Sequence, residues 1–196
     1  QMIVGATGES DRDIMYSSAF FYKNYNMKRV YYSGYVPISN DPRLPALGTQ
    51  VPMMRENRLY QTDWLMRFYG YDVRELLNND FQHLEMDIDP KLSYALRNRH
   101  LFPVDINKVD KQLLLRVPGI GLKSVNKILQ ARKFRKLNWE HLQKIGISMN
   151  RAKYFITCDA REKELKDVSS ENLKQLIIQN SFSKYRKEFN QQLSLF

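Results

Sequence analysis

The chain of 196 residues contains one cysteine, three histidines and no long apolar run. A single cysteine, Cys158, cannot form an internal disulfide, and His83, His100 and His141 are too scattered for metal-ligand spacing. No stretch approaches the ~20 apolar residues that span a bilayer, and no signal-peptide pattern is present. We therefore expect a soluble, cytoplasmic protein that has no membrane among its partners.

Acidic residues become scarce in the second half of the chain. Residues 1–105 hold 12 lysines and arginines against 13 acidic residues, whereas residues 106–196 hold 19 against 8, so the net charges are −1 and +11. This asymmetry indicates a nucleic-acid or other anionic partner for the second half. A solvated basic surface without any partner is the alternative that a charge count leaves open.

The first 54 residues have the pattern of a strand, a helix and a second strand. Residues 1–6 and 28–38 are rich in strand formers, and Ser10 with Asp13 forms a capping-box pattern before a helix that reaches Tyr25. Such a βαβ unit predicts parallel strands. Two parallel strands need further neighbours, and the chain begins inside the first of them. We therefore expect 1–54 to be part of a longer α/β protein, with a tag remnant at Gln1 as the alternative.

Helices dominate the rest of the pattern, so the predicted fold class is α+β and mostly α. Residues 37–52 hold four of the seven prolines and predict an irregular loop. A helical connector is predicted over 55–100, with one helix over 55–70 that ends at Gly70 and another over 89–100 capped by Asp89.

The stretch "VPGIGLKS" at 117–124 separates two further helices. We expect Asn107 to cap the first helix and Pro118 to end it. Gly119 and Gly121 permit positive φ and a close approach to a ligand, and the second helix begins near Leu122. The sequence therefore predicts backbone amides at a helix N-terminus beside two exposed lysines, an arrangement that binds phosphate.

The stretch "INKVDKQLLLRVPGIGLKSVNKILQAR" resembles the helix-hairpin-helix motif of DNA repair and competence proteins. The resemblance implies contact with the sugar-phosphate backbone without reading of the base sequence. It also implies a monovalent cation held by the backbone carbonyls of Leu115, Val117 and Ile120. The DNA-binding residues expected from the motif are Pro118, Gly119, Ile120, Gly121, Lys123, Ser124 and Lys127.

A second, degenerate copy of this pattern follows 27 residues later. The shift aligns Gly119 with Gly146 and Val125 with Ala152, although the copy "HLQKIGISMNRAKYFI" lacks the proline and the second glycine. Paired motifs form a compact helical domain in this family, so the resemblance implies a (helix-hairpin-helix)2 DNA-binding domain over residues 101–158. Arg151 and Lys153 are then candidates for a second backbone contact.

The sequence excludes a helix-hairpin-helix glycosylase. Such an enzyme needs a loop carboxylate about twenty residues beyond the hairpin, and its iron–sulfur version needs four cysteines. There is no acidic residue between Lys123 and Trp139, and Glu140 falls within a helical pattern.

Several segments together resemble the last half of radical S-adenosylmethionine proteins of DNA modification or repair. They are "QMIVGATGESDRDI", "KRVYYSGYVPI", "RENRLYQTDWLMRFYGY", "DIDPKLSYALRN" and "FPVDINKVDKQLLLRVPGIG". The resemblance implies that residues 1–38 close a radical-SAM-type barrel, and that the full-length protein binds a [4Fe–4S] cluster and S-adenosylmethionine. The three cluster cysteines lie upstream in that family, and only Cys158 is present here.

We therefore expect no catalytic residue and no cofactor in this chain alone, even if the full-length protein is a radical SAM enzyme. The loop "GATGES" either lines part of the S-adenosylmethionine site or is a plain strand-to-helix turn. The alternative function is a non-enzymatic DNA-binding adaptor.

The last five residues, "QLSLF", resemble the sliding-clamp-binding motif of bacterial replication and repair proteins. In that motif the glutamine anchors by hydrogen bonds and the apolar side chains fill a pocket. The resemblance implies a bacterial sliding clamp as partner for Gln192, Leu193, Ser194, Leu195 and Phe196. Residues 159–196 are predicted to be a helical extension with a mobile tail, and a tail folded back onto the core is the alternative.

Overall fold

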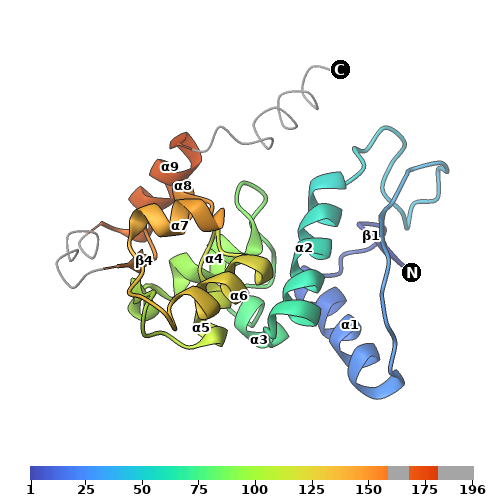
Figure 1. The fold of residues 1–196 in the computed structure, drawn as a ribbon. Helices are drawn as coiled ribbons and strands as arrows, with labels where there is room; N and C mark the ends of the chain where they lie inside the picture. Colours follow the sequence, from blue (N-terminus) through green and yellow to red (C-terminus); the bar gives the residue numbers. More distant parts are fainter. Residues whose placement is uncertain (159–167, 181–196) are drawn as a thin grey trace. The chain divides into compact units, whose positions relative to one another are not determined.

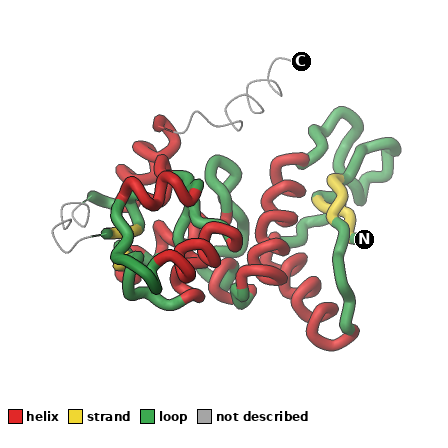
Figure 2. Tube along the Cα trace, in the orientation of Figure 1, coloured by secondary structure: helices red, strands yellow, loops and turns green. Residues whose placement is uncertain are grey.

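A computed structural model describes residues 1–158 and 168–180 (Figure 1). The chain divides into two compact units, residues 1–94 and 95–196, and the boundary falls within one helix. The described residues form an α+β, mostly helical structure, as predicted, with a few short parallel strands (Figure 2). None of the helices in these two ranges is long and apolar enough to span a membrane.

The first unit contains two strands and the two longest helices of the described residues. In chain order its elements are β1 (Met2–Val4), α1 (Asp11–Tyr25), β2 (Tyr32–Gly34), α2 (Met53–Tyr69), α3 (Val73–Leu76) and α4 (Pro90–Arg97), the last of which crosses the boundary. The second unit continues with the 3-10 helix η1 (Arg99–Leu101), β3 (Val104–Asp105), α5 (Lys111–Arg116), α6 (Leu122–Ala131), α7 (Trp139–Ile145), α8 (Met149–Ala152), β4 (Ile156–Thr157) and α9 (Ser170–Asn180).

The predicted βαβ unit is present at the N-terminus. Strand β1 pairs in parallel with β2, with Met2 opposite Tyr32. Helix α1 begins at the expected capping box, in which Ser10 and Asp13 each accept a hydrogen bond from the other's backbone amide. Each strand has only three residues, fewer than the predicted 1–6 and 28–38, because regular pairing between them is limited to this short register.

Helix α2 covers the βαβ unit and completes its core. It begins at Met53, two residues before the predicted start, and ends at Gly70, whose φ of 69° is the left-handed cap conformation. Helix α4 begins after Asp89, whose side chain accepts a hydrogen bond from the Leu92 amide at 3.0 Å, as predicted for its cap. The buried core residues of this unit are Val4, Ile14, Met15, Val30, Tyr32, Leu59, Val73, Leu77 and Leu84.

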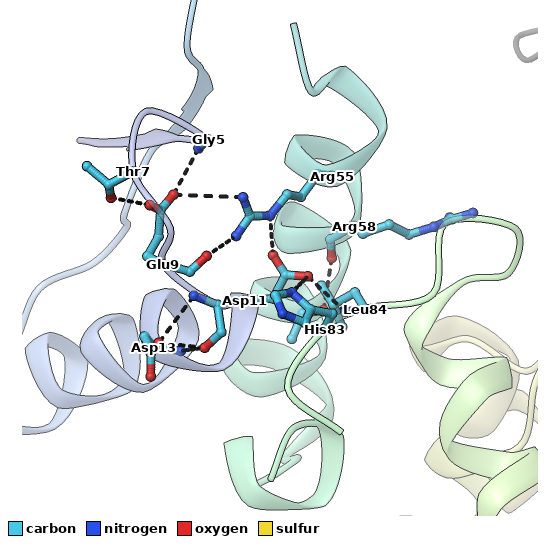
Figure 3. Close-up of polar contacts among 11 residues, drawn as sticks. Gly5, Thr7, Glu9, Asp11, Asp13, Arg55, Arg58, His83 and Leu84 are labelled. Carbon is cyan, nitrogen blue, oxygen red and sulfur yellow. Dashed lines mark hydrogen bonds and ion pairs between the residues drawn. The ribbon is translucent and has the colours of Figure 1, made fainter. Parts of the chain in front are cut away.

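An arginine on α2 ties the loop between β1 and α1 to the core (Figure 3). The guanidinium of Arg55 donates to the Asp11 carboxylate at 2.5 Å and to the Glu9 carbonyl at 2.6 Å. The other oxygen of Asp11 accepts from the Leu84 amide at 2.8 Å, and the Asp11 side chain is 1% exposed. This buried carboxylate therefore joins three segments: the start of α1, helix α2 and the chain near Leu84.

The same loop is closed by hydrogen bonds to Glu9. Partial burial opposes ionisation of this carboxyl, but hydrogen bonds from Thr7 and from the Gly5 amide outweigh it and lower the pKa of Glu9 from its ordinary 4.5. Because the folded-state pKa lies below the unfolded one, this contribution to stability is present above the unfolded pKa. It is lost as the pH falls through the lowered value.

The second unit corrects one cap assignment. Helix α5 begins at Lys111, and its cap is Asp110, which accepts from the Leu113 amide at 2.8 Å. The predicted cap, Asn107, instead accepts from the backbone amide of Leu137 at 2.7 Å and donates to its carbonyl at 3.1 Å. The Asn107 side chain therefore binds the backbone of Leu137 and does not cap a helix.

We expect Arg55→Met to destabilise the first unit by about 3 kcal/mol, because it leaves the buried Asp11 carboxylate without its charged partner. The matched control is Arg43→Met. Arg43 also pairs with an aspartate, Asp41, but the Arg43 side chain is 86% exposed. That change should cost at most about 1 kcal/mol.

Urea unfolding followed by Trp64 fluorescence in a Trp139→Phe background measures the first unit alone, since each unit holds one of the two tryptophans. Equal losses in the two variants would contradict the assignment of Asp11 as the centre of the network.

Candidate nucleic-acid interface

The turn between α5 and α6 is a tight proline–glycine turn. The Ile120 amide donates to the Val117 carbonyl at 3.2 Å, with Pro118 and Gly119 between them. Gly119 has a φ of +85°, so this four-residue pattern is that of a type II turn, with proline second and glycine third. The side chains of Pro118 and Ile120 are buried, which leaves only their backbone atoms for contact with a ligand.

The second glycine of the turn has a different role from the predicted one. Gly121 has a φ of −98° and a ψ of 172°, an extended conformation that other residues also adopt, so the expected positive φ is wrong for this residue. It is the N-cap of α6 and has no side chain to accept a hydrogen bond from the first helical turn. The amides of Lys123 and Ser124, in the first turn of α6, have no acceptor within the helix, because the first intrahelical bond runs from the Val125 amide to the Gly121 carbonyl.

The second hairpin repeats this arrangement. Gly146 has a φ of +87°, close to that of Gly119, and ends helix α7. Ser148 then occupies the place of Gly121 before α8 and makes no side-chain capping bond. The first helix of each hairpin is capped by a side chain, Asp110 for α5 and Asn138 for α7. In both hairpins, therefore, a side chain caps the first helix and none caps the second.

The two hairpins meet through a backbone contact. The Ser148 amide donates to the Gly119 carbonyl at 3.2 Å. A Cβ atom placed on Gly119 would lie 2.6 Å from the Ser148 carbonyl oxygen and 3.2 Å from the Ala152 nitrogen. Only glycine therefore allows this approach, and the contact places the N-terminal ends of α6 and α8 next to each other.

Packing positions of the repeat are conserved between the two hairpins, but the second copy is shorter. Val125 and Ala152 are both fully buried, as are Ile128 and Phe155. Helix α8 has four residues, and the chain then enters strand β4, which pairs in parallel with β3. The two hairpins therefore share a glycine of positive φ and buried residues at equivalent positions, whereas the last helix of the second hairpin is reduced to one turn.

The predicted basic residues differ in their surroundings. Lys123 is exposed in the first turn of α6. Lys127 is also exposed, but its ammonium donates to the Ile145 carbonyl at the end of α7, at 3.3 Å, and so joins the two helices. Arg151 is partly buried, and the ammonium of Lys153 lies 4.9 Å from the Tyr154 ring centre.

The electrostatic asymmetry is strongest in the described part of this unit. Residues 106–158 contain 12 lysines and arginines and only two acidic residues, Asp110 and Glu140. An aromatic side chain that the sequence analysis does not predict lies among these basic residues. It is Phe134, which is 86% exposed within "KFRK" after the end of α6. An aromatic residue between basic neighbours is the signal that could have identified it.

The carbonyls expected to bind a cation lie at the end of α5 and in the turn. Leu115 is in the last turn of α5, where carbonyls have no intrahelical donor, and the Val117 carbonyl already accepts from Ile120. A carbonyl oxygen can accept a second interaction, so this set remains a prediction.

No protein-family model, curated protein or solved structure matches the chain. The functional argument therefore depends on the residues and the geometry.

The expected absence of an iron–sulfur cluster from this chain remains a prediction. Such a cluster needs several thiolates, and the sequence offers only Cys158, which is buried after strand β4. The residues in 1–158 and 168–180 include no group of three histidine, cysteine or acidic side chains placed to hold a metal ion.

The loop "GATGES" fits a structural turn. Its carboxylate, on Glu9, is engaged by the Gly5 amide and the Thr7 hydroxyl, and Arg55 bonds to the Glu9 carbonyl (Figure 3). A role in binding S-adenosylmethionine remains a prediction. The clamp-binding residues expected at 192–196 lie outside the described residues.

We expect Gly119→Ala to destabilise the second unit more than Gly146→Ala. Both residues have a φ near +85°, so both variants carry the same backbone strain of about 1–2 kcal/mol. Only at Gly119 does the added Cβ meet backbone atoms, since nothing lies within 4 Å of the Cβ position at Gly146.

Urea unfolding followed by Trp139 fluorescence in a Trp64→Phe background measures this difference. If the two alanine variants lose the same stability, then the contact between the hairpins is not as tight as described.

Proposed function

We propose that residues 101–158 form a paired helix-hairpin-helix domain that binds the sugar-phosphate backbone of DNA with little sequence preference. The observation that carries this proposal is the N-terminus of α6, which no side chain caps and which the contact between Gly119 and Ser148 holds in place. Lys123 stands in its first turn, within a segment that has 12 basic residues and two acidic ones.

The chemistry of binding follows from this arrangement. A phosphate oxygen accepts hydrogen bonds from the amides of the first turn of α6, at the positive end of the helix dipole. Lys123 neutralises the charge, and a monovalent cation on the carbonyls of Leu115, Val117 and Ile120 adds a second positive centre. Helix α8 is one turn long, so Arg151 and Lys153 supply the second backbone contact through their side chains.

Low sequence preference is expected because these groups face phosphates. Amides and ammonium groups fix the position of a protein on DNA, whereas base edges carry the sequence information. Two duplexes of equal length and different sequence should therefore bind with similar affinity.

We expect the log–log salt slope on duplex DNA to be about −3.6, which corresponds to about four neutralised phosphates. Lys123→Ala should reduce it to about −2.7, because one phosphate contact is lost. The control is Lys23→Ala in the last turn of α1, an exposed lysine of the first unit, which should leave the slope unchanged.

Fluorescence anisotropy titrations at several salt concentrations give these slopes. The same slope for Lys123→Ala and for the unsubstituted protein would remove Lys123 from the interface. Absence of salt-dependent binding would overturn the proposed function.

The resemblance further supports a place for this chain in a radical-SAM-type protein of DNA modification or repair. In this proposal the unit β1–α1–β2 closes a barrel, and the [4Fe–4S] cluster and S-adenosylmethionine bind to a part of the full-length protein that supplies the cysteines. The cluster would then supply the reductive cleavage of S-adenosylmethionine, and the residues described here would hold the DNA.

The second candidate is a non-enzymatic adaptor, which needs none of the cluster cysteines. Such an adaptor binds DNA and recruits a partner. Because the C-terminal "QLSLF" resembles the clamp-binding motif, we propose a bacterial sliding clamp as that partner. The same contact would serve a repair enzyme, so the cluster distinguishes the two candidates.

We expect a labelled peptide that ends in Gln192–Phe196 to bind purified bacterial clamp saturably. Leu195→Ala and Phe196→Ala should each weaken it, because each apolar side chain contributes about 1.5–3 kcal/mol on burial. Binding that is absent, or unchanged in both variants, would remove the clamp from the proposal.

An anaerobic absorption spectrum of the full-length polypeptide decides between enzyme and adaptor, since a colourless protein favours the adaptor.

A further inference from the structure

A shallow groove lies between α6 and α7, two helices that contact each other. Its volume of about 580 Å³ is within the ~300–1,000 Å³ typical of ligand sites, and its lining is mainly apolar. Ala131 and Ile145 contribute to the wall, and the ammonium-bearing side chains of Lys127 and Lys144 lie along it. Phe134 lines the groove as well.

Phe134 has an exposure that packing does not explain. It is 86% exposed, the highest value among the exposed large hydrophobic residues of the described chain. It stands in the turn after α6, where its amide donates to the Ala131 carbonyl at 3.2 Å. Its neighbours Lys133, Arg135 and Lys136 are exposed as well, and Arg135 also contacts the His141 ring.

The charge around the groove selects its occupant. An apolar partner helix has no negative charge to offer the lysines of the groove, whereas a nucleotide offers both an apolar face and a negative phosphate. Stacking of a base on an aromatic ring requires that the base be unpaired, because a duplex hides base faces in its own stack.

The groove and the turn at Gly121 are connected by one helix face. Lys123 and Lys127 are four residues apart on one face of α6, and Lys127 lines the groove together with Phe134 from the turn after the helix. Helix α6 has ten residues and therefore spans about 15 Å, a distance that a strand of a few nucleotides covers. One bound segment can thus reach both places.

We propose that Phe134 and the groove between α6 and α7 bind an unpaired base of the DNA strand whose phosphate lies at the N-terminus of α6. The ring stacks on the base, Lys127 and Lys144 face the adjoining phosphates, and the amide side chains of Asn126 and Gln130 line the same groove. This inference rests on the proposed DNA binding and adds a preference for single-stranded or locally unpaired DNA.

The test compares a labelled oligo-dT of about twelve nucleotides with a duplex of equal length, using the 1–196 chain. Phe134→Ala should weaken oligo-dT binding about 5- to 150-fold, which corresponds to the loss of one stacked base, and should change duplex binding less than about 2-fold. The matched control is Phe20→Ala in α1, an exposed phenylalanine of the first unit, which should leave both affinities unchanged.

A second readout reports stacking directly. Phe134→Trp in a background of Trp64→Phe and Trp139→Phe provides a single tryptophan, and its fluorescence should be quenched by oligo-dT and not by the duplex. Equal effects of Phe134→Ala on the two DNAs, or no quenching, would overturn the proposed base site. Salt-dependent duplex binding would then still support the backbone interface, and its absence would count against the proposed function itself.

The remaining outcome concerns a different occupant. If Phe134→Ala dissociates a dimer of the chain, as measured by sedimentation, the groove is a contact between two copies and the proposal is overturned. A monomer with oligo-dT binding weakened by the same substitution supports it.

Discussion

The second unit depends on one close approach between two stretches of backbone. The Gly119 carbonyl accepts from the Ser148 amide, and the space beside Gly119 is too small for any side chain. This contact fixes the direction of α6 relative to the second hairpin. Because backbone atoms have no rotamers, a junction of this kind holds its geometry without the entropic cost of ordering long side chains. The positions of the first turn of α6 and of Lys123 follow from it.

The first unit is organised by a different constraint, a buried charge. Asp11 lies at the start of α1, and its two carboxylate oxygens are bonded to segments far along the chain. A buried carboxylate without partners is expensive, so this ion pair specifies how the loop before α1, helix α2 and the chain near Leu84 come together. Glu9 and Thr7 then complete the loop with shorter-range bonds.

The helix caps and helix ends that could be predicted from the sequence depend on residues that are close together in the chain. The capping box of Ser10 and Asp13, the end of α2 at Gly70 and the cap at Asp89 involve residues within a few positions of one another, so the sequence alone displays both partners. The positive φ of Gly119 was predicted for the same reason. The general class of the fold, α+β and mostly helical, also follows from such signals.

The failures involve partners that are distant in sequence. The sequence predicts Asn107 as a helix cap, but its side chain forms hydrogen bonds with the backbone of Leu137, thirty residues away. No local pattern indicates this partner. The sequence predicts the same positive φ for Gly121 as for Gly119, although only Gly119 has a positive φ and contacts the second hairpin. The strand-forming stretch 28–38 pairs over three residues because β1 offers no longer register. Phe134 is 86% exposed among the described residues, and a hydrophobicity pattern cannot indicate that an aromatic residue stays uncovered.

The bare N-terminus of α6 has a thermodynamic consequence. A side-chain cap typically contributes about 1 kcal/mol to the stability of a helix. Helices α5 and α7 have such a cap, and α6 has none. Any anion that occupies this end becomes the missing cap, and mass action then couples its concentration to the population of the folded unit. If an anion binds there, its occupancy is linked to the folding equilibrium. The unit is then least stable without the anion, and the amides of the first turn exchange with solvent most freely in that state.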